Sequence, residues 1–247
     1  MPVALTIALA AAVGLALGSV LNVVIYRLPR RLRLFRRLRC TRCGHSLAWE
    51  ATPLLGFLLQ LGRCRHCRQP IPIFFPLAEA FTAIVFALLV WRHGVTLLSG
   101  FYAVYSLALI LTLFVDWLHH DIYYLVLVPA TALALLAPLL HPDPRRGIVN
   151  ALAGLGIGLL FFGLLFLFGQ LLFHSQALGL GDVWLAGTIG AMTGLYGALL
   201  SLTAGIILAA LGAGALLLIR RVSAKHYMPY GAFLCLAALG YLCLWAP

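Results

Sequence analysis

Long apolar runs separated by short polar segments dominate the sequence. A helix needs about 20 consecutive apolar residues to cross the hydrocarbon core of a bilayer. By this measure the pattern predicts an all-α membrane protein with about eight transmembrane helices. They are expected near Val3–Tyr26, Phe75–Trp91, Leu97–Val115, Ile122–Leu140, Ile148–Phe173, Asp182–Leu199, Leu202–Ile219 and Pro229–Trp245, with a turn at Leu200–Ser201.

Two pairs of glycines within these runs have a spacing that suits close helix contact. Gly154 and Gly158 lie in one predicted helix, and Gly190 and Gly194 lie in the next. Small residues four positions apart allow helix backbones to approach closely in lipid. Glycine is also common in membrane helices, and that frequency accounts for each pair equally well.

The composition supports lipid as the solvent for most of the chain. Of 247 residues, 64% are hydrophobic and 9% are charged, whereas soluble domains carry roughly a quarter charged residues. So few charges cannot cover a water-facing surface. The chain has only six acidic residues, and an acid inside an apolar run is costly and therefore a functional candidate.

The net charge of +11 is concentrated beside the first predicted helix, where eleven of the seventeen basic residues lie between Arg27 and Arg68. The positive-inside rule assigns this segment to the cytoplasm and the N-terminus to the outer side. No basic residue precedes the first apolar run, which argues against a cleaved signal peptide. The loop lacks the interleaved aromatic residues of a base-stacking surface, so the expected partner is the bilayer and not a nucleic acid.

Two C-x-x-C pairs lie in this basic segment, Cys40-Thr-Arg-Cys43 and, twenty residues later, Cys64-Arg-His-Cys67. Pairs at this spacing can place four thiolates tetrahedrally around Zn²⁺. A closed four-cysteine site is structural, and it supplies folding energy to a loop with too few apolar residues for its own core. The alternatives are two unrelated thiol pairs or redox-active C-x-x-C pairs. The sequence therefore divides into a first helix at 1–26, a cytoplasmic zinc loop at 27–75 and a helical bundle at 76–247.

Asp116 ends one apolar run and Asp182 begins another, within Gly179-Leu-Gly-Asp182. On the expected topology both acids lie at the cytoplasmic ends of helices. Two neighbouring carboxyl groups in a low dielectric share one proton, so that one can accept a proton from water while the other donates one to a carbonyl oxygen. Gly179 and Gly181 would let an extended peptide approach the second acid closely. The alternative makes Asp182 a helix cap and Asp116 an interfacial residue.

Two further acids are secondary candidates. Asp121 lies in the same loop as Asp116 and is expected to be more exposed. Glu79 lies near the start of the second predicted helix, close to the cytoplasmic interface. It is interpreted as a cap, as a partner of the loop arginines, or as a residue that binds or supports the substrate.

An ordered set of motifs runs through nearly the whole chain. It comprises Gly18-Ser-Val-Leu-Asn-Val-Val-Ile-Tyr-Arg-Leu-Pro29, the two C-x-x-C pairs, Pro53-Leu-Leu55, Pro76-Leu-Ala-Glu79, Asp116 with Pro129, Gly179-x-Gly-Asp182-Val183 and Met228-Pro-Tyr-Gly231. Together these motifs resemble the bifunctional type IV prepilin peptidases, which are leader peptidases with N-methyltransferase activity.

The resemblance implies a multi-pass aspartic endopeptidase of the bacterial inner membrane, active at the cytoplasmic face. Its substrates would be type IV prepilins and type II secretion pseudopilins, whose new N-terminus it would methylate with S-adenosylmethionine. The resemblance assigns catalysis to Asp116 and Asp182, within 76–247. It assigns the zinc to Cys40, Cys43, Cys64 and Cys67, in a methyltransferase-associated loop. No pattern locates the S-adenosylmethionine site, and none predicts the oligomeric state.

The chain departs from the family at two places near the acids. The family usually has Leu-Pro-Asp or a similar segment after the first acid, where this chain has Ile122-Tyr-Tyr-Leu125, and lysine two positions after the second, where this chain has Trp184. We expect these changes to affect efficiency and substrate choice more than the reaction class. The alternative functions are a non-enzymatic assembly factor that docks through the zinc loop, and a proton-coupled transporter. A transporter is disfavoured because both acids lie at one membrane face and not near the midplane.

Overall fold

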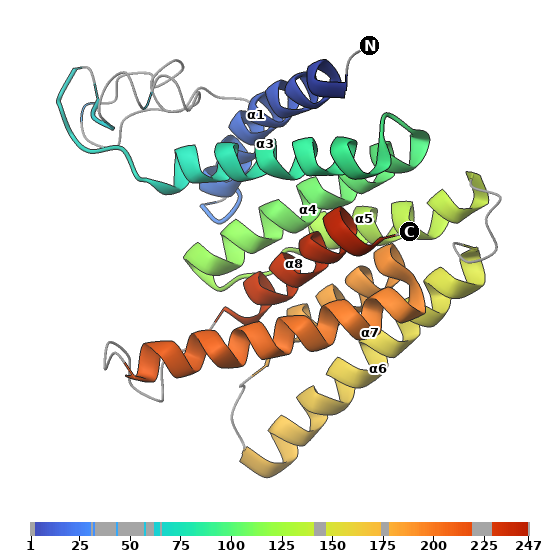
Figure 1. The fold of residues 1–247 in the computed structure, drawn as a ribbon. Coiled ribbons are helices and arrows are strands. Elements are labelled where there is room, and N and C mark those ends of the chain that lie inside the picture. The colour runs from blue at the N-terminus through green and yellow to red at the C-terminus, as the bar shows by residue number, and fades with distance from the viewer. Residues whose placement is uncertain are drawn as a thin grey trace. The chain divides into compact units, whose positions relative to one another are not determined.

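The computed structural model describes residues 3–30, 32, 43, 57, 62–64, 66–140, 147–173, 178–218 and 229–246. Within these residues the regular structure is helical, apart from one isolated bridge between Arg63 and Pro70, which confirms the all-α class (Figure 1). The chain divides into two compact units, Met1–Ser99 and Gly100–Pro247. The predicted boundaries at residues 26 and 75 remain a prediction.

The first unit is built on two helices, α1 (Val3–Arg27) and α3 (Phe74–His93). Glycines of α1 bring the two backbones together. A Cβ atom added at Gly14 would lie 2.7 Å from the Cα of Ala83, and one added at Gly18 would lie 2.8 Å from the Cα of Glu79. Both positions therefore exclude a side chain, which lets α1 and α3 pack closely in lipid.

The second unit contains most of α4 and the four helices that follow it. The elements are α4 (Leu97–His119), α5 (Tyr124–Leu136) with the 3₁₀ turn η1 (Ala137–Leu140), α6 (Ile148–Phe173), α7 (Leu180–Leu218), and α8 (Tyr230–Gly240) with the π-helical turn η3 (Tyr241–Trp245). α6 and α7 pack through the predicted glycine pairs. A side chain at Gly154 would meet the backbone of Gly190, and one at Gly158 would meet the backbone of Ala186.

The predicted turn at Leu200–Ser201 is wrong, because both residues lie inside α7 and the hydroxyl of Ser201 donates to the carbonyl of Gly197 at 2.6 Å. The break in α7 is at Gly194, with φ +71° and ψ 179°, a backbone conformation that is essentially restricted to glycine. The side-chain oxygen of Asn150 accepts the N–H of Leu195 at 2.9 Å and so satisfies a donor that the break releases.

Beyond Gly194 the chain turns back along the unit (Figure 1). A Cβ atom at Gly197 would lie 2.7 Å from the ring of Tyr241, and one at Gly205 would lie 2.8 Å from the side chain of Leu234. The second half of α7 therefore packs along α8. The two halves of α7 form separate helical segments that meet at the break.

Five described helices are long and apolar enough to cross a membrane: Val3–Arg27, Phe74–His93, Leu97–His119, Ile148–Leu171 and Leu180–Ala215. Two shorter apolar segments are Tyr124–Leu140 and Tyr230–Trp245. Length and composition thus support a multi-pass membrane protein. The predicted number of eight spans remains a prediction.

Candidate active site

Asp116 lies in the last turn of α4 and is 3% exposed. Its Oδ2 atom accepts a hydrogen bond of 2.7 Å from the backbone N–H of Ala232, in the first turn of α8. The first N–H groups of a helix have no partner within that helix and carry its positive dipole end, so a carboxylate there is well stabilised. The acid is thus held by a helix that begins more than a hundred residues later.

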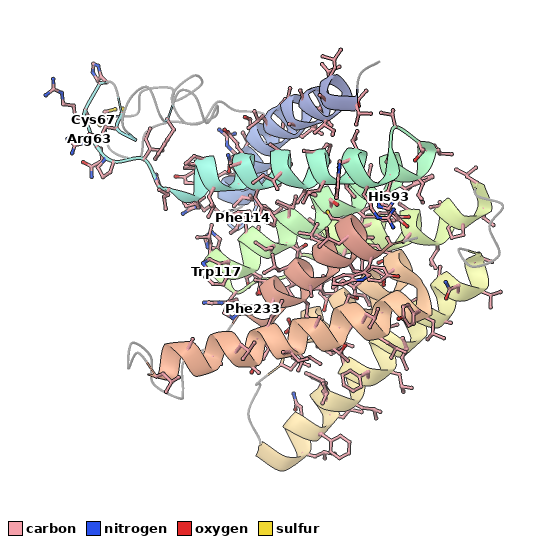
Figure 2. All side chains as sticks on the ribbon, viewed as in Figure 1. Arg63, Cys67, His93, Phe114, Trp117 and Phe233 are labelled. Carbon is pink, nitrogen blue, oxygen red and sulfur yellow. The ribbon has the colours of Figure 1, made fainter. Side chains whose placement is uncertain are left out.

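A second contact joins the same two helices at this end. The rings of Trp117 in α4 and Phe233 in α8 meet edge to face, with centroids 6.0 Å apart and planes at 65°, and Figure 2 labels both residues. Aromatic pairs of this geometry add stability beyond the area that they bury. The position of Asp116 relative to α8 is therefore supported by a hydrogen bond and by ring packing.

Asp182 lies in the first turn of α7 and is 5% exposed. Its Oδ2 atom accepts the backbone N–H of Gly179 at 3.0 Å, and its own N–H donates to the carbonyl of Gly179 at 3.1 Å. A carboxylate in the first turn that reaches back to the residue before the helix forms half of a capping box. The cap interpretation of Asp182 therefore describes its local geometry, and Gly179 is the residue that it caps.

Ile122 connects the surroundings of the two acids. A Cβ atom at Gly231 would lie 3.0 Å from both the Oδ2 atom of Asp116 and the Cδ1 atom of Ile122, and one at Gly181 would lie 2.9 Å from the Cβ of Ile122. Gly231 and Gly181 thus both pack on the side chain of Ile122. The two segments that carry the acids meet there because neither glycine has a side chain.

The two carboxyl groups lie close enough for a direct electrostatic interaction. The buried thiol of Cys235, one turn into α8, interacts with both of them. Asp121 also interacts with Asp116 but is exposed in the segment between α4 and α5, as the sequence predicted. Two buried neighbouring carboxyl groups can hold one proton between them, an arrangement that serves general acid and general base chemistry.

Sequence reasoning gave no role to Gly231, Ala232, Ile122 or Cys235. The motif Met228-Pro-Tyr-Gly231 was the available signal for the first two. Its contribution to the site is a backbone N–H group and the absence of a side chain, and neither is visible as a chemical group in a sequence.

A cysteine cluster lies in the first unit. The Sγ atoms of Cys43, Cys64 and Cys67 lie within 4.8 Å of one another, and those of Cys43 and Cys64 are 3.9 Å apart. Zn–S bonds of about 2.3 Å in a tetrahedron separate the sulfur atoms by about 3.8 Å. The three thiols therefore fit a zinc site in residue type and spacing. Cys40, the fourth predicted ligand, lies outside the described residues.

The second C-x-x-C pair lies on a tight turn, where Figure 2 labels Arg63 and Cys67. The N–H of Cys64 donates to the carbonyl of Gln69 at 2.8 Å, and the carbonyl of Cys64 accepts the N–H of Arg68 at 2.8 Å. Cys64 is buried with Ile71 and Phe75, and partly buried residues of α1 and α3 pack against this cluster. The turn is thus held against the ends of the two helices by apolar contacts.

Glu79 is fully buried between α1 and α3. Its Oε1 atom accepts hydrogen bonds from the hydroxyl of Ser19 at 2.9 Å and from the side-chain amide of Asn22 at 3.2 Å. The same amide nitrogen donates to the carbonyl of Phe75 at 2.8 Å. These donors belong to α1, and no side chain caps the first residue of α3. Glu79 therefore connects two helices rather than capping one.

Two family models match the chain. Residues 12–93 match the bacterial peptidase A24 N-terminal domain, and residues 103–214 match the type IV leader peptidase family. Each match falls within one of the two compact units. No solved structure matches the chain.

Curated relatives agree with the motif resemblance, and each is named a prepilin leader peptidase/N-methyltransferase. The Myxococcus xanthus protein is 39% identical, over 72% of this chain and 53% of its own length. The Pseudomonas putida protein is 30% identical, over 94% and 88%, respectively. The Klebsiella pneumoniae protein is 37% identical, over 73% and 82%. The match thus spans about half of the first relative and most of the other two.

Proposed function

We propose that this chain, which belongs to the type IV leader peptidase family, is an aspartic endopeptidase that removes the leader peptide from type IV prepilins and pseudopilins. The observation that carries the proposal is that two buried carboxyl groups, Asp116 and Asp182, lie within electrostatic range of each other. Gly231, which borders Asp116, and Gly181, which precedes Asp182, both pack on Ile122. The names of the relatives supply prepilins as the substrates, and the resemblance of the motifs supplies pseudopilins. We also infer that the chain N-methylates the new N-terminus, since these names include that activity.

In the proposed reaction one carboxyl group is ionised and the other is protonated. The ionised group takes a proton from water, whose oxygen attacks the scissile carbonyl carbon, while the protonated group donates its proton to the carbonyl oxygen. Collapse of the tetrahedral intermediate breaks the C–N bond, and the leaving amine takes up a proton. The N–H groups of Ala232 and Gly179 hold the two acids. The peptide backbone would approach at Gly179, because Ile122 fills the space beside Gly181.

We infer eight membrane crossings. Four are the helices α1, α3, α4 and α6, two are the halves of α7, and two are the shorter segments Tyr124–Leu140 and Tyr230–Trp245. This threading requires the end of α4 and the starts of α5, α7 and α8 at one face. The contacts of Asp116 with Ala232 and of Ile122 with Gly181 support that requirement. We assign this face and the cysteine loop to the cytoplasm, and the N-terminus to the periplasm of the inner membrane.

Cys40, Cys43, Cys64 and Cys67 would hold Zn²⁺ as a structural ion. Its role would be to stabilise the fold of the loop, since four thiolates leave no open position for substrate. The residues that would bind S-adenosylmethionine, which supplies the methyl group, are not assigned. Glu79 would support the cysteine cluster indirectly, because Asn22 joins it to the backbone of Phe75, which packs on Cys64.

The proposal is tested with detergent-purified protein and a purified prepilin. Asp116→Asn and Asp182→Asn should each abolish cleavage, because an amide can neither hold nor transfer the shared proton. The matched control is Asp121→Asn, which should retain most of the activity. Near wild-type turnover by either of the first two variants would refute the assignment. Mass spectrometry of the product N-terminus measures cleavage and methylation together.

A further inference from the structure

The two places where the sequence departs from the family near the acids lie in contact. Tyr124 is the first residue of α5, and Trp184 lies two positions after Asp182 in α7. Their rings meet edge to face, with centroids 6.3 Å apart and planes at 73°. The two rings together therefore form one aromatic surface built from two helices.

This aromatic surface lies beside the carboxyl pair. Trp184 shares the first turns of α7 with Asp182, and Tyr124 follows the segment whose Ile122 packs on Gly181 and Gly231. Gly231 in turn borders Asp116. Tyr124 and Trp184 thus lie two residues along the chain from Ile122 and Asp182, respectively.

The base beneath the aromatic surface is closely packed. Two turns further along α5 and one turn further along α7, the hydroxyls of Thr131 and Thr188 form a buried hydrogen bond of 2.7 Å. Leu127 and Leu185, between these threonines and the rings, are completely buried. α5 and the first half of α7 therefore form a fixed support, and rigid aromatic side chains on such a support lose little entropy when they bind a partner.

The rings remain accessible above this base, with Tyr124 47% and Trp184 37% exposed. Leu125 and Leu180, which flank the two segments, are more exposed still. The nearby residues Ile122, Leu125, Leu180 and Val183 along the two segments are apolar. Such a surface binds an apolar or aromatic side chain better than a charged or small polar one.

We propose that Tyr124 and Trp184 form a subsite that binds an apolar side chain of the substrate close to the scissile bond. The inference rests on the proposed peptidase function and names the residues that set its substrate choice. The occupant is the substrate and not a lipid tail, because Trp184 shares the first turns of α7 with Asp182, and Tyr124 lies two residues after Ile122, which packs on Gly181 and Gly231.

The test crosses enzyme variants with substrate variants. Prepilins with alanine at each of the residues flanking the scissile bond are cleaved by the wild type, Trp184→Ala, Trp184→Phe and Tyr124→Ala. At one of these positions, Trp184→Ala should lower kcat/KM about tenfold for the prepilin with its apolar side chain. For the prepilin with alanine at that position, kcat/KM should change little, as expected for loss of an aromatic contact. Trp184→Phe should restore most of the discrimination. Trp245→Ala, which removes an exposed aromatic ring at the far end of α8, should change nothing.

Each outcome decides the proposal. If Trp184→Ala lowers kcat/KM equally for every substrate, Trp184 acts as a membrane anchor or as part of the fold, and the subsite is overturned. Unchanged discrimination in both alanine variants would overturn it while leaving the peptidase function intact. Absence of cleavage by the wild type would overturn both. A second readout is the binding of uncleaved prepilin to the Asp116→Asn, Asp182→Asn double variant, with and without Trp184→Ala. Trp184→Ala should raise the Kd about tenfold for the prepilin that keeps its apolar side chain at the same position.

Discussion

The carboxylate of Asp116, in the last turn of α4, accepts the backbone N–H of Ala232 in the first turn of α8. Gly231, next to that donor, has no room for a side chain between Asp116 and Ile122. The start of α8 thus positions an acid without contributing a side chain of its own. Its effect on the acid can be tested by adding one methyl group.

Gly231→Ala should lower kcat by about tenfold to a hundredfold, because small displacements of a reacting group are costly in rate. The added Cβ would lie 3.0 Å from both Oδ2 of Asp116 and Cδ1 of Ile122. Adding Ile122→Val removes the second contact and should recover part of the activity. The control is Gly156→Ala in α6, where no atom lies within 4 Å of the added carbon. Full activity of Gly231→Ala would refute the positioning role.

Cys64→Ala should release the bound metal, because Cys64 contributes one of three converging thiols. Elemental analysis of purified protein should find about one zinc per chain in the wild type and much less in the variant. Cys243→Ala, which removes another buried cysteine far along the chain, should keep its zinc. Stoichiometric zinc in Cys64→Ala would contradict a site built on this cluster.

Glu79→Ala should destabilise the first unit by about 2–4 kcal/mol, because it leaves a cavity and removes an acceptor from the partly buried hydroxyl of Ser19 and the buried amide of Asn22. Glu79→Gln keeps an acceptor oxygen and should cost less. Ser19→Ala alone should cost about 1 kcal/mol. The double variant Ser19→Ala, Glu79→Ala should lose less than the sum, since the residues share a hydrogen bond. Denaturant unfolding in detergent measures all four variants, and strict additivity would contradict the coupling.

Gly194→Ala should destabilise the second unit by about 1–3 kcal/mol, because alanine is strained at the φ of +71° recorded there. The new methyl group would also meet the side chain of Asn150. Gly214→Ala in the second half of the same helix, with no atom within 4 Å of the added carbon, should be neutral or slightly stabilising. Equal unfolding midpoints for the two variants would contradict the break at Gly194.

The sequence predicted those features that depend on the character of a single segment. The apolar runs gave the helices, and the scarcity of acids singled out Asp116 and Asp182. The break in α7 was missed because it depends on Asn150, in another helix, which accepts the N–H of Leu195. Glu79 was interpreted as a cap, as a partner of the loop arginines or as a residue that supports the substrate. Its hydrogen bonds with Ser19 and Asn22 were not predicted, because these donors lie almost sixty residues earlier. The sequence alone did not show whether Gly154 and Gly190 mark a helix contact, because glycine is common in membrane helices. The structure shows that their backbones pack closely.

The bond from Ala232 to Asp116 also sets an order of events during synthesis. The ribosome has made both acids long before it reaches residue 232. A nascent chain can therefore insert α4 and the first half of α7 while Asp116 still lacks this donor. Activity should begin only when α8 enters the bilayer, which delays proteolysis until synthesis has passed residue 232.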